Sequence, residues 1–233
     1  IFEDYEKCYD TLFGAALISE IKDIIFIKKI ETKRDSADSN ERDYYDNQVK
    51  KIYNEWNLRF QQLEDSTKLM YETICVRSLL LNKNQMGKYW IKFLQKEAEK
   101  GKTQLGEIAL SYVNQDYPEV QFSQSLMLWN SNNQEKAIEK LTSVVKGLPK
   151  TSKLLPKFLT VLGNWHMERL EYEDVFNYFS KVTTLASKSS ENWGNLAKVT
   201  LLLSQKYNSV EYSYQSLRAN INGLINGPSN PIS

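Results

Sequence analysis

The sequence has few of the residues that build disulfide frameworks, metal centres or tight turns. It contains 2 cysteines, 1 histidine, 9 glycines and 5 prolines in 233 residues. Cys8 and Cys75 are too few for a disulfide framework, and no C-x-x-C pair indicates a metal site. Sparse cysteine is typical of a reducing compartment, so we expect an intracellular protein, cytoplasmic or nuclear.

Charge and hydropathy exclude further classes of protein. The 30 basic and 29 acidic residues leave a net charge of +1, whereas nucleic-acid binding normally shows as a strong basic excess. The longest apolar runs, at residues 24–27 and 79–81, are far shorter than the roughly 18 residues that span a bilayer. No signal peptide is visible. Because the chain begins at Ile1 and not at Met, we expect a fragment or a processed product.

The apolar residues that are present recur every three or four positions, which predicts amphipathic helices. This pattern runs through residues 5–30, stops in a polar loop at 33–41 that we expect to be exposed, and resumes at 45–80 with a cap at Asp65 or Ser66. We therefore expect a long-helix part at residues 1–85, shorter helix hairpins at 86–225 and a disordered tail at 226–233. No strand pattern is visible.

The shorter helices repeat along the chain. Residues 132–141 (NNQEKAIEKL) resemble residues 170–179 (LEYEDVFNYF), at an offset of 38 residues. Each segment has a turn, acidic residues, a small or β-branched residue and then large apolar residues, as in the second helix of a tetratricopeptide repeat. One such unit cannot bury its apolar face alone. We therefore predict an all-α fold, an α-solenoid of tetratricopeptide-like antiparallel helix hairpins.

The sequence contains no recognisable catalytic constellation. His166 is the single histidine and has no nucleophile motif beside it, so we interpret it as a packing residue. Gly101 and Gly106 are too far apart for a dinucleotide fingerprint, and the kinase motifs are absent. We expect Cys75 to be an inert core thiol. The sequence therefore predicts no catalytic residue and no metal ligand.

Two further patterns have both a structural and a functional interpretation. Lysines spaced by four residues share one helical face and could attract an anion, but nearby acidic residues favour an ordinary solvated face; they are Lys88, Lys92, Lys96 and Lys100. The tryptophans recur about once per helix pair, which favours inter-helix packing over a binding platform; they are Trp56, Trp90, Trp129, Trp165 and Trp193.

Several motifs in order resemble the FAT domain of phosphatidylinositol-3-kinase-related protein kinases, most closely that of target-of-rapamycin (TOR) kinases. They are ISEIKDII at 18–25, WNLR at 56–59, ICVRSLLL at 74–81, YWIKF at 89–93, KGK at 100–102, PEVQF at 118–122 with LW at 128–129, LGNW at 162–165 and NWGNLA at 192–197. The resemblance covers about residues 5–207. It departs from the family at the loop 33–40 and at Asn195, where an aromatic residue or histidine is expected.

The resemblance implies a non-catalytic scaffold segment of a serine/threonine protein kinase. In that family the FAT solenoid clamps the kinase domain and contacts regulatory subunits, and it biases the kinase between two states. The family resemblance also implies inositol hexakisphosphate in a basic pocket, for which Arg77 and Lys102 match basic positions. No cofactor is otherwise required. The alternative is a stand-alone tetratricopeptide-type adaptor that binds a peptide or protein partner. An enzyme is the least favoured class of function.

Overall fold

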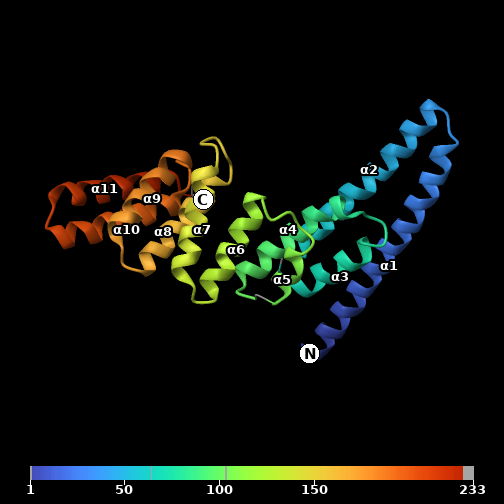
Figure 1. Cartoon of the computed structure of the whole chain (residues 1–233), viewed down its shortest axis with the longest axis horizontal. Helices are drawn as coiled ribbons and strands as arrows, with labels where there is room; N and C mark the ends of the chain where they lie inside the picture. Colours follow the sequence, from blue (N-terminus) through green and yellow to red (C-terminus); the bar gives the residue numbers. More distant parts are fainter. Residues whose placement is uncertain (1, 64, 103, 228–233) are drawn as a thin grey trace, which may run out of the picture. The chain divides into compact units, whose positions relative to one another are not determined.

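The chain is helical over the residues that the computed structural model describes, which are 2–63, 65–102 and 104–227, with side chains described from Thr11 onward. Eleven helices and no strand lie within these ranges (Figure 1), which confirms the predicted all-α class. Residues 228–233 of the predicted tail lie outside the described residues.

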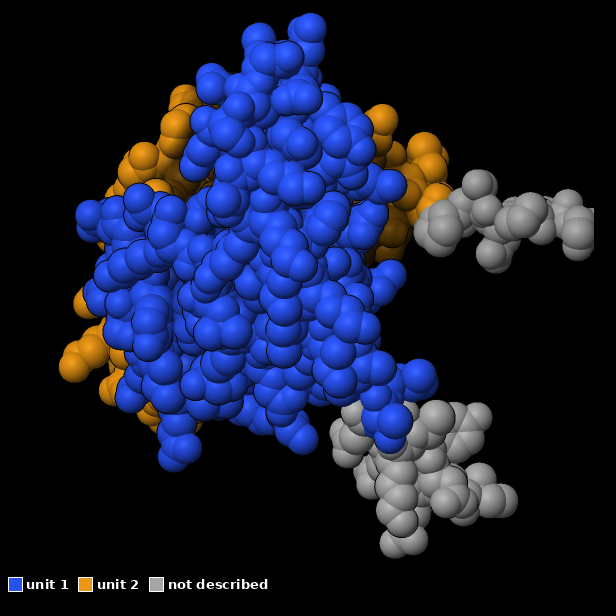
Figure 2. All heavy atoms as spheres, turned by 90° about the vertical axis from the view of Figure 1, so that its right-hand side faces the viewer, with its two compact units in different colours: residues 1–116 blue, residues 117–233 orange. Residues whose placement is uncertain are grey.

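The helices divide into two compact units, Ile1–Asp116 and Tyr117–Ser233 (Figure 2). The expected change of architecture at residues 85–86 lies inside one helix, α4 (Lys83–Glu99). That helix carries a single buried face from Met86 to Ala98. The packing is therefore continuous where the sequence pattern suggested a boundary.

Unit 1 begins with the two longest helices, α1 (Phe2–Asp35) and α2 (Ser39–Gln62), which form an antiparallel hairpin (Figure 1). The helices α3 (Thr67–Arg77), α4 and α5 (Gln104–Leu110) complete the unit, with α3 packed on α1 and α4, and α5 packed on α4. Side-chain caps start two of them: Ser66 accepts the N–H of Leu69, and Asn82 forms a reciprocal capping box with Gln85.

The polar loop predicted at residues 33–41 is shorter in the structure. Helix α1 extends to Asp35 and α2 starts at Ser39, so the turn contains only residues 36–38. Asp38 caps α2 by accepting the N–H of Glu41, and Ala37 is buried. Polar composition predicted a break in the apolar face correctly, but a good cap allows the helix to begin inside a polar segment.

Unit 2 contains three antiparallel helix hairpins. They are α6 (Pro118–Asn130) with α7 (Gln134–Gly147), α8 (Leu155–Glu168) with α9 (Tyr172–Leu185), and α10 (Ser190–Tyr207) with α11 (Val210–Ile225). Successive hairpins contact each other through α7 with α8 and α9 with α10. This arrangement confirms the helical solenoid, with Pro118 at the first turn of α6 as predicted.

The same turn closes each hairpin and recurs every 38 residues. One residue of each turn is left-handed: Asn132 (φ 60°), Leu170 (φ 62°) and Asn208 (φ 48°). The next N–H in each turn donates to the carbonyl five residues earlier, at 3.0–3.1 Å. Leucine is the unusual member, because its Cβ disfavours this conformation. The repeat period predicted from residues 132–141 and 170–179 therefore extends to α11.

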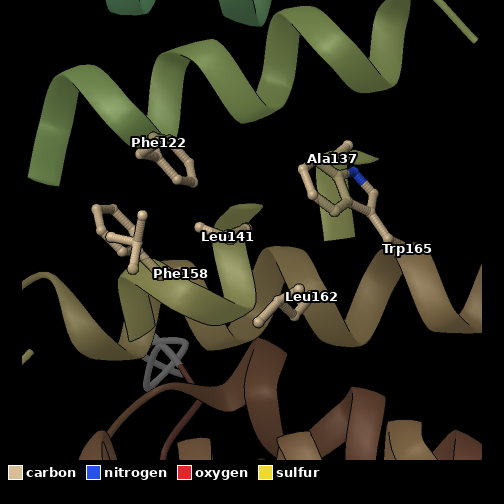
Figure 3. Packing of buried hydrophobic residues seen from close by; sticks show 7 residues of the cluster. Phe122, Ala137, Leu141, Phe158, Leu162 and Trp165 are labelled. Carbon is tan, nitrogen blue, oxygen red and sulfur yellow. The ribbon is translucent and has the colours of Figure 1, made fainter. Parts of the chain in front are cut away.

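Stacked aromatic rings dominate the core between the first two hairpins (Figure 3). Phe122 of α6 stacks on Phe158 of α8 with ring centres 4.4 Å apart, and Leu141 and Leu162 complete the same buried cluster. Trp129 and Trp165 stack in the same way at 4.5 Å. Three of the five tryptophans are buried and two are half-buried against a core cluster, which confirms the packing interpretation.

Candidate functional site

Arg77, one of the two predicted polyphosphate contacts, is fully buried in the last turn of α3. Its Nε and Nη2 donate to the two carboxylate oxygens of Glu20 on α1, at 3.0 and 2.5 Å. Nη2 also donates to the carbonyl of Trp56 on α2, at 2.9 Å. One guanidinium therefore joins α1, α2 and α3, and its charge is already neutralised by Glu20, which is 4% exposed.

Aromatic rings surround the rest of the Arg77 guanidinium. Its central carbon lies 5.1 Å from the Trp56 ring centre, 5.3 Å from that of Phe60 and 4.8 Å from that of Tyr89. Such cation–π contacts compensate in part for Nη1, which is buried without a hydrogen-bond partner. Burial raises the pKa of Tyr89, whose hydroxyl donates to Asn57 at 3.0 Å. This environment is that of a buried ion pair that joins helices, rather than that of an open anion site.

Four of the sequence motifs that carried the family resemblance, at 18–25, 56–59, 74–81 and 89–93, contribute residues to this site. Asp23 accepts from Trp56 Nε1 at 2.9 Å and from Arg59 at 3.0 Å, and Arg59 lies 3.9 Å from Glu20. The pairing of Glu20 with Arg77 is not apparent in the sequence, because the two residues are 57 positions apart. The acidic residues within an otherwise apolar α1 face were the available signal.

Lys102, the second predicted contact, is exposed, and no contact joins it to Arg77 among the described residues. Its backbone N–H donates to the carbonyl of Glu97 at 3.0 Å. The structure therefore does not bring the two predicted residues together in one contact set.

The lysine series on α4 has protein partners. Lys88 donates to Asn57 at 2.9 Å and lies over the Tyr89 ring, and burial together with the charge of Arg77 lowers its pKa. Lys96 pairs with Glu99 at 3.3 Å, and Lys100 donates to the Asp65 carbonyl at 2.6 Å. The ordinary interpretation of this face accounts for its arrangement.

His166 lies in a small cluster of hydrogen-bonded polar residues at the α8–α9 turn. Its Nδ1 is 2.5 Å from Glu171, and its ring stacks on Tyr178. Arg169 donates to the other oxygen of Glu171 at 2.9 Å. Partial burial would raise the pKa of Glu171, but the hydrogen bond from His166 and the charge of Arg169 lower it on balance. Asp174 lies close enough to His166 and Glu171 for the three to share a metal, yet Glu171 is already engaged by His166 and Arg169.

Two kinds of surface remain for contact with other molecules. The first is a groove of about 440 Å³ between α7, α8 and α9, with an apolar floor and lysines at its rim. The second is a row of exposed apolar side chains along α11 at alternating steps of four and three; they are Val210, Tyr214, Leu217, Ile221 and Leu224. Both surfaces present apolar side chains to solvent.

Comparison with known families decides the classification. The model of the FAT domain family matches residues 1–225, and this range includes every described helix from Phe2 to Ile225. The chain belongs to the FAT domain family. Among curated proteins, none matches the chain.

A FAT domain is a non-catalytic segment of phosphatidylinositol-3-kinase-related proteins. Within the described part of this FAT domain, no helix combines the length and the apolar character needed to cross a bilayer.

The repeat of this FAT domain makes the apolar row on α11 informative. The helices α7, α9 and α11 begin at Gln134, Tyr172 and Val210, a constant spacing of 38 residues. At equivalent positions, Leu141 and Phe179 are fully buried, whereas Leu217 is 60% exposed. The face that the next hairpin covers in α7 and α9 is therefore open in α11.

Proposed function

We propose that this FAT domain is a scaffold segment of a TOR-like serine/threonine protein kinase, which clamps the kinase domain and contacts regulatory subunits. The open face of α11 carries the proposal. A helical-repeat protein that works alone needs a polar outer face on its last repeat. Here that face presents Leu217, which is 60% exposed, at the position where Leu141 and Phe179 are buried in the two earlier repeats.

The first helix supports the same interpretation. Ile18, Ile21 and Ile25 are exposed on α1, three and four residues apart, although Glu20 and Ile24 on the same helix are buried. Exposed apolar residues at helical spacing are typical of a face that packs against another protein surface. Both faces favour a domain built into a larger assembly over a stand-alone adaptor.

The TOR branch is supported by the motifs at 76–79, 89–93 and 100–102. Physically, a clamp of this kind acts through contacts that differ between two states of the kinase. In unit 1 a buried ion pair joins three helices, and in unit 2 aromatic rings stack between hairpins. We expect these contacts to make each unit stiff enough to transmit such a bias.

Site-specific photo-crosslinking tests the proposal. A photo-crosslinking amino acid at Leu217, in the full-length parent protein, should capture another segment of the same polypeptide, identified by mass spectrometry. The same amino acid at Lys198, an exposed position of α10, is the matched control and should give no such capture. Capture of a different polypeptide only would contradict the clamp on the kinase domain and favour the adaptor alternative, and capture of neither would contradict the whole proposal.

A second test measures the clamp itself. Leu217→Glu changes an exposed side chain, so this domain should keep its free energy of unfolding within about 0.5 kcal/mol. The kinase activity of the parent protein should nevertheless change, because a charge now lies in a buried contact. Unchanged kinase activity would refute a clamping role for α11. Reading the coding sequence beyond Ser233 for kinase motifs is the simplest complement.

Binding of inositol hexakisphosphate stays a prediction. Arg77 is engaged by Glu20, so Lys102 is the predicted contact that remains open to solvent. Calorimetry at low salt with wild-type domain and Lys102→Gln tests it, and equal heats would remove Lys102 from the prediction.

A further inference from the structure

We propose that the groove between α7, α8 and α9 binds an acidic amphipathic segment of a partner protein. The inference rests on the proposed scaffold function and adds the chemistry of one partner. Three observations carry it. The groove has an apolar floor that is already packed, and the lysines at its rim make no ion pair with any described residue. The residues around the groove are rich in lysine, although the whole chain is nearly neutral.

The floor of the groove is preformed. Leu155 and Leu159 of α8 are buried and pack with Val182 of α9, while Val145 and Leu148 cover the same cluster. Leu185, at the end of α9, is exposed beside them. The volume of about 440 Å³ falls within the roughly 300–1,000 Å³ typical of ligand pockets. A partner can therefore insert apolar side chains without the domain having to rearrange.

The rim supplies positive charge without compensation. Lys146, Lys150 and Lys181 line the groove, are exposed, and make no ion pair with any described residue. Residues 140–167 and 175–190, which include the parts of α7, α8 and α9 that line the groove, contain seven lysines and no Asp or Glu; the acidic residues of these helices lie outside the two ranges. Because the whole chain carries only +1, acidic residues are concentrated elsewhere. A groove lined by one sign of charge attracts a partner of the opposite sign.

The apolar floor and the lysine rim together favour one class of anionic ligand over another. A free phosphate or polyphosphate has no use for an apolar floor, and the groove offers it no guanidinium. Thr184 is the one hydroxyl in the lining, and it donates to the carbonyls of Ser180 and Lys181. A helical or extended peptide with apolar anchors and flanking Asp or Glu satisfies both the floor and the rim.

Fluorescence anisotropy with designed peptides tests the proposal on the full chain. The probe is a labelled amphipathic peptide of about 14 residues, or four helical turns, with leucines on one face and glutamates on the other. One matched peptide replaces the glutamates by glutamine, and a second replaces the leucines by alanine. We expect the probe to bind at least about tenfold more tightly than either, and binding to weaken with salt.

Matched protein variants locate the site. Lys146→Glu with Lys181→Glu should weaken probe binding at least about tenfold at low salt, because two attractive charges become repulsive. Lys198→Glu, on α10 and outside the groove, should bind as wild type does. Leu185→Asp should also weaken binding, through the floor. All four positions are exposed, so circular dichroism should show unchanged helix content.

Three results would overturn the proposal. The double lysine variant could bind the probe as tightly as wild type, which would place the site elsewhere. The alanine peptide could bind as tightly as the leucine probe, or inositol hexakisphosphate could displace these two peptides equally. Either result would indicate a site that recognises negative charge alone. Failure here leaves the proposed scaffold function intact, since that function depends on the crosslink from Leu217. Conversely, capture of a separate polypeptide at Leu217 would not affect the peptide result.

Discussion

Removing Glu20 should destabilise unit 1 more than any surface substitution, because it leaves Arg77 buried without its counter-ion. Arg77 is 0% exposed and Glu20 4%, and two charge-assisted hydrogen bonds join them. Breaking a buried pair by removing one partner typically costs about 3–5 kcal/mol. We expect Glu20→Ala to lower the free energy of unfolding by that amount, since the Trp56 carbonyl remains as an acceptor but cannot neutralise the cation.

Replacing both members of the pair separates lost charge pairing from lost packing. Glu20→Leu with Arg77→Met should recover to within about 1 kcal/mol of wild type, because a buried ion pair is often no more stable than apolar residues of similar size. The methionine would lie among the rings of Trp56, Phe60 and Tyr89, a favourable setting for sulfur. Glu55→Gln is the surface control: Glu55 lies 3.7 Å from Arg59 but is half exposed, so its loss should cost no more than about 1 kcal/mol.

Urea unfolding followed by tryptophan fluorescence measures these differences, and hydrogen exchange at α3 reports on unit 1 separately from unit 2. A Glu20→Ala protein within 1 kcal/mol of wild type would refute the role of the pair. A double variant as unstable as the single one would show that the ionic contact itself, rather than the buried unpaired charge, sets the stability.

Three further outcomes test other parts of the fold. Trp129→Ala removes a half-buried ring stacked on a second tryptophan, so we expect a loss of about 2–3 kcal/mol, below the roughly 3–5 of a fully buried ring; an unchanged urea midpoint would mean that the stack contributes nothing. Leu170→Gly should raise the free energy of unfolding by about 1 kcal/mol, because leucine is left-handed here and 66% exposed; a lower melting temperature would contradict this. Hydrogen bonds from Lys206 and then Tyr207 lower the pKa of Glu173 to about 2. Since the folded pKa is depressed, its contribution is present above the ordinary value of 4.5 and is lost as pH falls toward 2. The difference in urea midpoint between wild type and Glu173→Gln should shrink over that range, and a difference constant with pH would refute the assignment.

The sequence by itself determined most of the helices of unit 2. The repeat segments 132–141 and 170–179 contain the observed starts of α7 at Gln134 and α9 at Tyr172, and the motif at 118–122 contains the start of α6 at Pro118. These boundaries are set locally, by a proline at the first turn, by turn residues and by apolar period, so short segments contain the necessary information. The 38-residue repeat was visible for the same reason.

Local pattern was less informative in unit 1. The loop predicted at 33–41 proved to be a three-residue turn, and the expected boundary at residues 85–86 falls inside α4. Polar residues at the tip of a long helix hairpin look like a loop in sequence, because most of them are exposed and so show no apolar period. Whether such a segment stays helical depends on its cap and on the helix packed beside it.

Only the tertiary structure decided what the candidate residues do. Arg77 was predicted as an anion contact, but it is buried in an ion pair with Glu20. This partner lies on another helix, 57 positions away in the sequence. The lysine-rimmed groove combines residues from α7, α8 and α9, and the open face of α11 is apparent only when its exposure is compared with that of the earlier repeats. Helix formation is a local property of the chain, whereas burial, charge pairing and exposed faces depend on which distant helices meet.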